Sequence, residues 1–165
     1  MNIQDLRTLL EYHYWARDRM LAAAERVTPE QFRKELGSSF TTLQDTLAHV
    51  CSAEWAWHQR WVGSSPTAQL QSSTFPDVAA VRAHWLQTEK NVRTFIESAG
   101  ETGVDRAISY KTLTGDDRVT PLWQMVQHLV NHASYHRGQI TTLLRQLGQP
   151  APESTDLIRF YWERK

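Results

Sequence analysis

Three histidines at four-residue intervals are the residues of this sequence whose spacing best suits chemistry. His128, His132 and His136 lie in the segment TPLWQMVQHLVNHASYHRGQITTLLRQLG. On a helix, residues four positions apart lie on one face, about 6 Å apart along the axis, so two such imidazoles can bind one metal ion. His128 and His136 would be about 12 Å apart, which is too far for one ion to bind all three. The spacing therefore predicts a metal site at either His128 and His132 or His132 and His136.

The apolar pattern of this segment favours the second pair. Its apolar residues recur at helical spacing and define a stripe, formed by Met125, Leu129, Ile140 and Leu143. His132 and His136 lie along that stripe, whereas His128 lies further round the helix. Because a buried polar side chain is costly without a partner, a metal ion shared by His132 and His136 would satisfy both rings.

A third ligand has to come from another helix, and His49 is the best candidate. It lies in the middle of the helical pattern TLAHVCSAEW, among small and apolar neighbours. Asp45 lies one turn before His49 and could orient a ring or a bound water. Three histidine ligands leave coordination positions open for water or substrate, as catalytic metal sites do and closed structural sites do not.

The alternative for each histidine is a hydrogen-bonded residue of the protein core. Buried polar groups are usually hydrogen-bonded, and an isolated HxxxH pair on a helix often arises by chance. His13, His58 and His84 lie in more polar or mixed surroundings, and we expect them to be structural or exposed. Cys51, two residues after His49, is expected near the opposite side of that helix, as a small core residue rather than a ligand or nucleophile.

Other site chemistries lack their motifs in this sequence. Di-iron bundles use Glu-x-x-His pairs on facing helices, but Glu54 and His58 are four residues apart. The sequence contains no HExxH, no G-x-S-x-G, no Walker loop and no dinucleotide glycine pattern. A single cysteine excludes an intramolecular disulfide and a thiolate zinc cluster.

Four long amphipathic helices are expected to position the histidines. Their apolar residues recur at three- and four-residue steps over about residues 3–27, 39–62, 78–100 and 121–147. Asp77 is the predicted N-cap of the third helix, and Thr120 with Pro121 marks the predicted start of the fourth. Four helices of this length with little strand predict an all-α four-helix bundle.

Shorter elements connect these helices. Thr28 to Gln31 reads as a capping box that starts a short helix through about Lys34. Residues 101–120 break the helical period and alternate apolar with polar residues, which predicts a short strand pair or an extended segment before the last long helix. The tail STDLIRFYWERK is expected to form a short closing helix.

Composition limits the classes of function. The 165 residues are 41% hydrophobic and 22% charged, which is ordinary for one globular domain spanning residues 1–165. Lysine plus arginine equals aspartate plus glutamate at 18 each, so there is no whole-molecule attraction to nucleic acid or an anionic membrane. No stretch approaches a membrane span or a signal peptide, and we expect a cytoplasmic protein.

Three segments of the chain resemble the DinB-like (DinB/YfiT-like) family of small helical bundles. They are YHYWARDRML in the first helix, LQDTLAHVCSAEWAWHQR in the second and NHASYHRGQITTLLRQLG in the fourth. The segment SYKTLTGD is similar to the short extended stretch that precedes the last long helix in this family. The family shares its name with a DNA polymerase, which this chain does not resemble.

The resemblance implies a metal site and a class of activity. It implies a four-helix bundle, often dimeric, with a divalent metal such as nickel or zinc held by His49, His132 and His136. Characterised relatives use low-molecular-weight thiols, which suggests transfer of a thiol to an electrophile or a related hydrolysis, with a small-molecule substrate. Gln139, one turn beyond His136, and Asp45 could lie beside the open metal position, or both could be ordinary polar groups.

Two other functions fit the same sequence. The chain could be a non-catalytic, divalent-metal-binding stress-response protein, in which the ion mainly holds three helices together. It could also be an interaction module that dimerises through exposed residues among its seven tryptophans.

Overall fold

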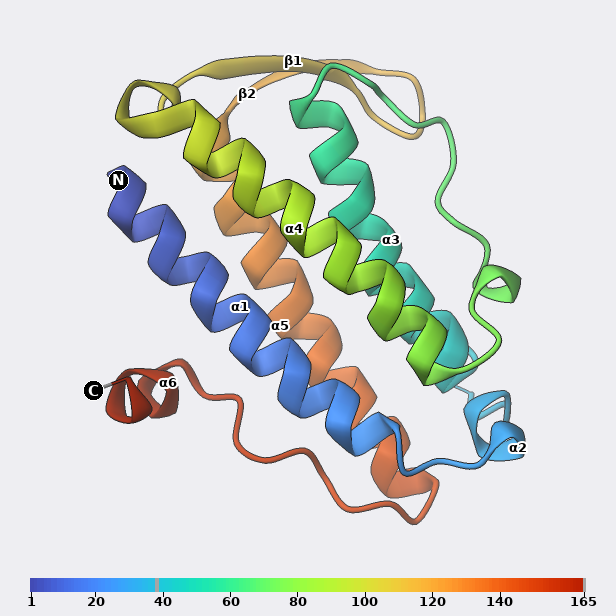
Figure 1. The fold of residues 1–165 in the computed structure, drawn as a ribbon. Helices are drawn as coiled ribbons and strands as arrows, with labels where there is room; N and C mark the ends of the chain where they lie inside the picture. Colours follow the sequence, from blue (N-terminus) through green and yellow to red (C-terminus); the bar gives the residue numbers. More distant parts are fainter. Residues whose placement is uncertain (38, 165) are drawn as a thin grey trace.

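Four long helices form most of the protein in the computed structural model, which describes residues 1–37 and 39–164. They are α1 (Ile3–Ala24), α3 (Leu43–Trp61), α4 (Val78–Gly103) and α5 (Leu122–Gln146). Both α1 and α3 pack against α4 and against α5, so the four helices surround a common interior (Figure 1). The chain is therefore mostly helical, as its periodicity predicts.

Short elements lie at the ends of the long helices or beside them. The strands β1 (Ala107–Lys111) and β2 (Asp117–Pro121) form an antiparallel hairpin at the end where α3 finishes (Figure 1). The helix α2 (Pro29–Phe32) lies near the opposite end, and the 3₁₀ helix η1 (Ser72–Thr74) interrupts the loop between α3 and α4. The last helix, α6 (Leu157–Glu163), contacts α1.

Most of the predicted boundaries are confirmed. The Asp77 side chain caps α4 by accepting a hydrogen bond from the Ala80 amide at 2.7 Å. Thr28 and Gln31 form both hydrogen bonds of a capping box before α2. Gly100 interrupts α4 with a φ of 59°, a left-handed value that glycine adopts without steric cost. The regular helix therefore ends at the predicted residue, and one further turn follows it. Residues 107–121 form the strand pair.

Two boundaries were predicted wrongly. The first helix ends at Ala24, three residues earlier than expected. Thr120 does not cap α5, because it pairs with Ile108 in the β hairpin and is extended. Pro121 takes the N-cap position instead, with no side-chain cap bond. A threonine before a proline suits the end of a strand as well as the start of a helix, since the residue before proline favours extended backbone.

The helices bury their apolar faces in two adjoining groups of side chains. The group nearer α2 includes Leu47, Trp85 and Ile140, and the group nearer the hairpin includes Leu10 and Trp61. The apolar stripe of α5 contributes to both groups. Within the described residues, no helix combines the length and the apolar character that crossing a membrane requires.

Candidate metal centre

The structure brings His49, His132 and His136 together between α3 and α5. Each residue offers one ring nitrogen, and these three nitrogens all lie within 4.8 Å of one another. The Nε2 atom of His132 is 3.1 Å from Nε2 of His49 and 3.1 Å from Nε2 of His136. His132 and His136 are one turn apart on α5, and the packing of α3 against α5 brings His49 to the same point. The three residues form the histidine cluster.

Two glutamines fix how the outer rings of the cluster are oriented. Gln69 accepts a hydrogen bond at its Oε1 from Nδ1 of His49 (3.0 Å), and Gln139 accepts one from Nδ1 of His136 (2.6 Å). An amide oxygen can only accept, so both Nδ1 atoms carry hydrogen. In the neutral rings, both Nε2 atoms then present a lone pair toward His132, as metal-ligating histidines do when an outer partner sets the tautomer.

The converging nitrogens suit a shared cation. Nε2 of His132 carries at most one hydrogen and cannot donate fully to both neighbours, so at least one of the lone pairs on His49 and His136 faces His132 without a proton of its own. Metal–nitrogen bonds of about 2.0–2.1 Å place two ligand nitrogens about 2.8–3.4 Å apart in octahedral or tetrahedral geometry. The observed separations of 3.1 Å lie within that range. The residues present therefore fit a three-histidine divalent metal site.

Electrostatics keep the histidine cluster neutral in the absence of a cation. Burial, together with repulsion of a second positive charge by the neighbouring His136 and His49, lowers the pKa of His132 to about 3. Burial also lowers the pKa of His49 and of His136. Neutral imidazole is the form that binds a metal, so the three side chains are ready to act as ligands near neutral pH.

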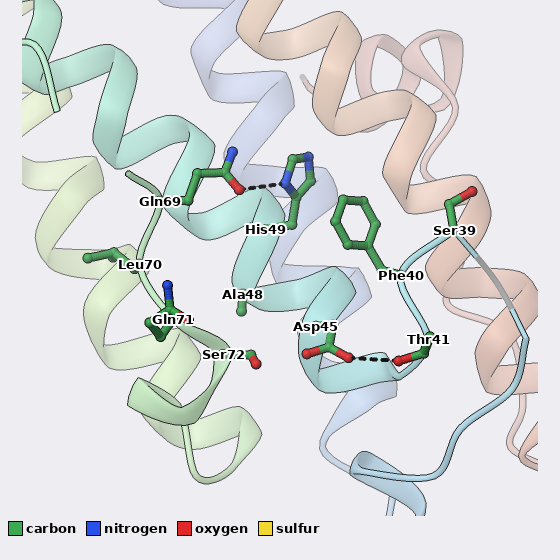
Figure 2. Close-up of a pocket in the computed structure, with 10 residues that line it drawn as sticks. All are labelled: Ser39, Phe40, Thr41, Asp45, Ala48, His49, Gln69, Leu70, Gln71 and Ser72. Atoms are coloured by element: carbon green, nitrogen blue, oxygen red, sulfur yellow. Dashed lines mark hydrogen bonds between the residues drawn. The ribbon is translucent and has the colours of Figure 1, made fainter. Parts of the chain in front are cut away.

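A pocket of about 390 Å³ opens beside His49 (Figure 2). Phe40 forms one wall, with its ring stacked 4.3 Å from that of His49 and edge-on to His136 at 5.7 Å. Gln69 and Gln71 lie on the opposite side, on the loop that follows α3. One edge of the histidine cluster thus borders a pocket with polar and aromatic walls.

Hydrogen bonds to α3 hold the loop that carries Gln69. The Leu70 amide donates to Oγ of Ser52, which is fully buried one turn beyond His49 (2.8 Å). Gln44 donates from its side chain to the carbonyl groups of Ser72 and Phe75 at 3.2 and 2.8 Å. The helix that carries His49 therefore also positions the glutamine that orients its ring.

Asp45 lines the pocket but does not orient an imidazole. Its carboxylate accepts hydrogen bonds from the hydroxyl groups of Thr42 (2.7 Å) and Thr41 (3.2 Å) at the start of α3, and Figure 2 shows it directed at Thr41. Burial opposes ionisation, but these hydrogen bonds outweigh it and lower the pKa of Asp45. Asp45 is thus an ionised carboxylate in the first turn of α3, at the pocket edge, and the hydrogen bonds that orient imidazole rings come from Gln69 and Gln139.

The structure also resolves which histidine pair faces His49. His128 lies outside the histidine cluster, with its ring 5.8 Å from that of His132 and 5.2 Å from Trp57. His58 and His84 lie away from the cluster and are half-buried or buried, as expected for structural residues. His13 is also a structural residue, as expected, because it is fully buried and bonds to Glu54.

Gln69 and Phe40 are site residues that the sequence does not reveal. Both lie on loops, where no periodicity indicates which way a side chain points, and their sequence positions are 20 and 9 residues from His49. Cys51 is a buried core residue, as predicted, and burial raises the pKa of its thiol far above the ordinary value.

The fold and the histidine cluster define a class of mostly helical proteins with a three-histidine site between two helices. The chain belongs to the DinB family, whose sequence profile matches residues 1–165. It is 24% identical to Protein DinB of Bacillus subtilis (strain 168) over 160 residues, which is 92% of each chain. Its fold is similar to the crystal structure of a DinB-like protein from Bacillus cereus ATCC 10987, with a TM-score of 0.69 and 17% identity over 88% of this chain and 95% of that one.

Proposed function

We propose that the chain is a metal-dependent enzyme with the four-helix bundle of DinB-like proteins. In this proposal His49, His132 and His136 hold one zinc or nickel ion. The enzyme transfers a low-molecular-weight thiol to an electrophilic small molecule, or carries out a related hydrolysis. The observation that supports it most is the convergence of three neutral Nε2 atoms, two of them oriented by glutamines, at the edge of an open pocket.

The protein's own residues have separate roles in this proposal. Gln69 and Gln139 hold the rings of His49 and His136 in the tautomer that presents Nε2. Phe40 excludes water from one face of His49. Asp45 stays ionised at the pocket edge and orients a water or thiol there. A bound divalent ion would supply Lewis acidity that stabilises a thiolate or hydroxide near neutral pH.

Metal content tests the first part of the proposal. Protein purified without a histidine tag should contain about one equivalent of zinc or nickel, and His132→Ala should lose it. His128→Ala is the matched control, because His128 is one turn away on the same helix but outside the histidine cluster. Absence of metal from the unmodified protein, even after incubation with both ions, would return the three histidines to a hydrogen-bonded core role.

Turnover separates catalysis from metal storage. With metal content established, a panel of low-molecular-weight thiols and electrophiles should yield a thioether product, and His49→Ala should abolish its formation. Full activity in that variant would contradict the enzyme proposal. If chelation of the metal strongly lowers thermal stability and no thiol–electrophile pair is turned over, the results would favour a non-catalytic metal-binding protein.

The proposed partners are a small molecule and a second copy of the chain. A homodimer is supported by exposed apolar side chains on α6, among them Ile158 and Trp162, which are 54% and 62% exposed. Sedimentation velocity tests this proposal, because a monomer whose sedimentation does not change with concentration would contradict it.

A further inference from the structure

Arg60, in the last turn of α3, is a buried arginine whose contacts are aromatic. The residue is 7% exposed, and its Nε atom is buried without a hydrogen-bond partner among the described residues. Its guanidinium carbon lies 4.6 Å from the ring centre of Trp57 and 5.4 Å from that of Tyr110. Aromatic faces attract a cation, but they do not accept the hydrogen bonds that a guanidinium donates.

The other buried arginines also have nitrogens without a partner among the described residues (Nη1 of Arg17, and Nε and Nη1 of Arg137), but their guanidinium groups make polar contacts. Arg17 is bonded to Glu89 at 2.6 Å and to Asp18 at 2.9 Å. Arg137 donates to the hydroxyl groups of Tyr12 (2.8 Å) and Ser134 (2.6 Å). No ion pair of Arg60 occurs within residues 1–37 and 39–164. A buried cation without an anion is costly, so the structure leaves an anion-binding group unused.

Arg60 lines a pocket of about 540 Å³ between α3, the β hairpin and α5. This second pocket differs from the one beside His49 in its apolar and aromatic lining. Among the described residues that line it there is no carboxylate, and its walls include Trp57, Tyr110, Leu113, Met125 and His128. Asp116, in the hairpin turn, is bonded to the hydroxyl groups of Thr112 and Thr114 and does not pair with Arg60. The volume is in the range of small-molecule sites.

The second pocket adjoins the histidine cluster. His128 lines it, and the His128 ring lies 5.8 Å from that of His132. A molecule in this pocket would therefore contact both Arg60 and the His128 wall beside the histidine cluster.

We propose that this second pocket binds a small organic carboxylate, with its apolar body against Trp57, Leu113 and Met125 and its carboxylate on the Arg60 guanidinium. A guanidinium matches a carboxylate with two parallel hydrogen bonds, and aromatic walls exclude the water that would weaken them. The assignment of this acid as the electrophilic substrate rests on the proposed function. The binding of the acid at Arg60 is independent of the proposed function, because that binding requires no metal.

The experiment compares an acid with its neutral isostere in the unmodified, full-length protein. The probes are 4-phenylbutyrate and 4-phenylbutyramide, titrated by ligand-observed NMR and by the shift of the Trp57 indole N–H signal. A charge-assisted hydrogen bond is worth about tenfold in affinity or more, so the acid should bind at least about tenfold more tightly than the amide. Both titrations are run on chelator-treated and on zinc-loaded protein, and the preference should be present in each.

Two variants assign the preference to Arg60. Arg60→Gln should reduce the preference for the acid to about one, while retaining weak binding of both probes. Arg118→Gln is the control, because Arg118 is an exposed arginine of the same hairpin and should leave the preference unchanged. Circular dichroism checks that both variants are folded, and the acid–amide comparison in the unmodified protein does not depend on either variant.

Specific outcomes would overturn the inference. Equal affinities for the acid and the amide in the unmodified protein would contradict it. So would a preference for the acid that is unchanged in folded Arg60→Gln, or one that is lost to the same extent in Arg118→Gln as in Arg60→Gln. Binding of the acid to the zinc-loaded protein alone would mean that the metal, not Arg60, holds the carboxylate. An Arg60-dependent preference in a protein that never shows turnover would support this pocket while contradicting the proposed enzyme activity, so the two failures are distinguishable.

Discussion

His13 of α1 and Glu54 of α3 form a 2.8 Å hydrogen bond in the interior of the protein, where their side chains are 0% and 2% exposed. The same carboxylate accepts hydrogen bonds from the Tyr14 hydroxyl (2.8 Å) and the Trp85 indole N–H (2.5 Å). Glu54 thus connects α1, α3 and α4 through one buried group. Because each donor would be left unpaired without it, this network makes the arrangement of these helices specific.

Removing the Glu54 carboxylate should destabilise the protein strongly. Glu54→Ala leaves three buried donors without an acceptor, and we expect the free energy of unfolding to fall by about 3–5 kcal/mol. Glu54→Gln keeps one acceptor oxygen and should cost about 1–3 kcal/mol. Urea denaturation measures both values. Glu97→Gln is the control, because Glu97 pairs with Arg7 at the surface and its loss should cost no more than about 1 kcal/mol.

The same network predicts how stability changes with acid. Burial alone would raise the pKa of Glu54, but His13 and the donated hydrogen bonds outweigh it and hold the pKa below its ordinary value of 4.5. A carboxyl whose pKa is lowered by folding contributes stability that is present above its unfolded pKa and is lost as pH falls through its folded pKa.

The measurement is urea unfolding of metal-free protein between pH 7 and pH 3. The stability difference between the unmodified chain and Glu54→Gln should be constant near neutral pH and should shrink below about pH 4.5. A difference that stays constant down to pH 3 would show that Glu54 has the same pKa in the folded and unfolded chain.

Cys51 should be unreactive in the folded protein. Its thiol is fully buried, burial raises its pKa, and the thiolate is the form that attacks alkylating reagents. We expect iodoacetamide at pH 8 to label the folded chain at least about 100-fold more slowly than the chain in guanidinium, as measured by intact mass. Rapid labelling without denaturant would mean that α3 opens readily at this position.

Periodicity predicts the parts of this fold that repeat along a helix. The apolar stripe of α5 separates His132 and His136 from His128 correctly, because burial of one face imposes a spacing that the sequence records. The capping residues Asp77 and Thr28 are predicted correctly as well, because the start of a helix depends on residues that are neighbours in the sequence. Thr120 is misread because its environment is decided by pairing with Ile108 rather than by its own neighbours.

Contacts between distant segments are not encoded in any local pattern. Glu54 lies in an apolar run, and only the packing of α1 and α4 against α3 supplies the three donors that make its burial tolerable. Gln69 is one polar residue among many in the loop between α3 and α4, and the Ser52–Leu70 hydrogen bond is what directs it to His49. Such residues become visible only when the chain is folded.

Gln69 should contribute to metal affinity without binding the metal. Its amide oxygen fixes Nδ1 of His49 as the protonated nitrogen, and losing such an outer partner weakens metal sites by about 10–100-fold. We therefore expect Gln69→Ala to weaken zinc binding by about that factor, measured by competition with a chromophoric chelator. Gln71→Ala is the matched control, because Gln71 lines the same pocket and its loss should change the affinity by less than about twofold.

Gln139→Ala extends this comparison to the second glutamine. Gln139 accepts from Nδ1 of His136 at 2.6 Å, so its removal should weaken zinc binding to a similar degree as the removal of Gln69. The two glutamines orient different rings on different helices, and their effects on the free energy of binding should add in the double variant. Unchanged zinc affinity in both single variants would show that the rings are held by packing against Phe40 and α5, and that the glutamines do not select the tautomer.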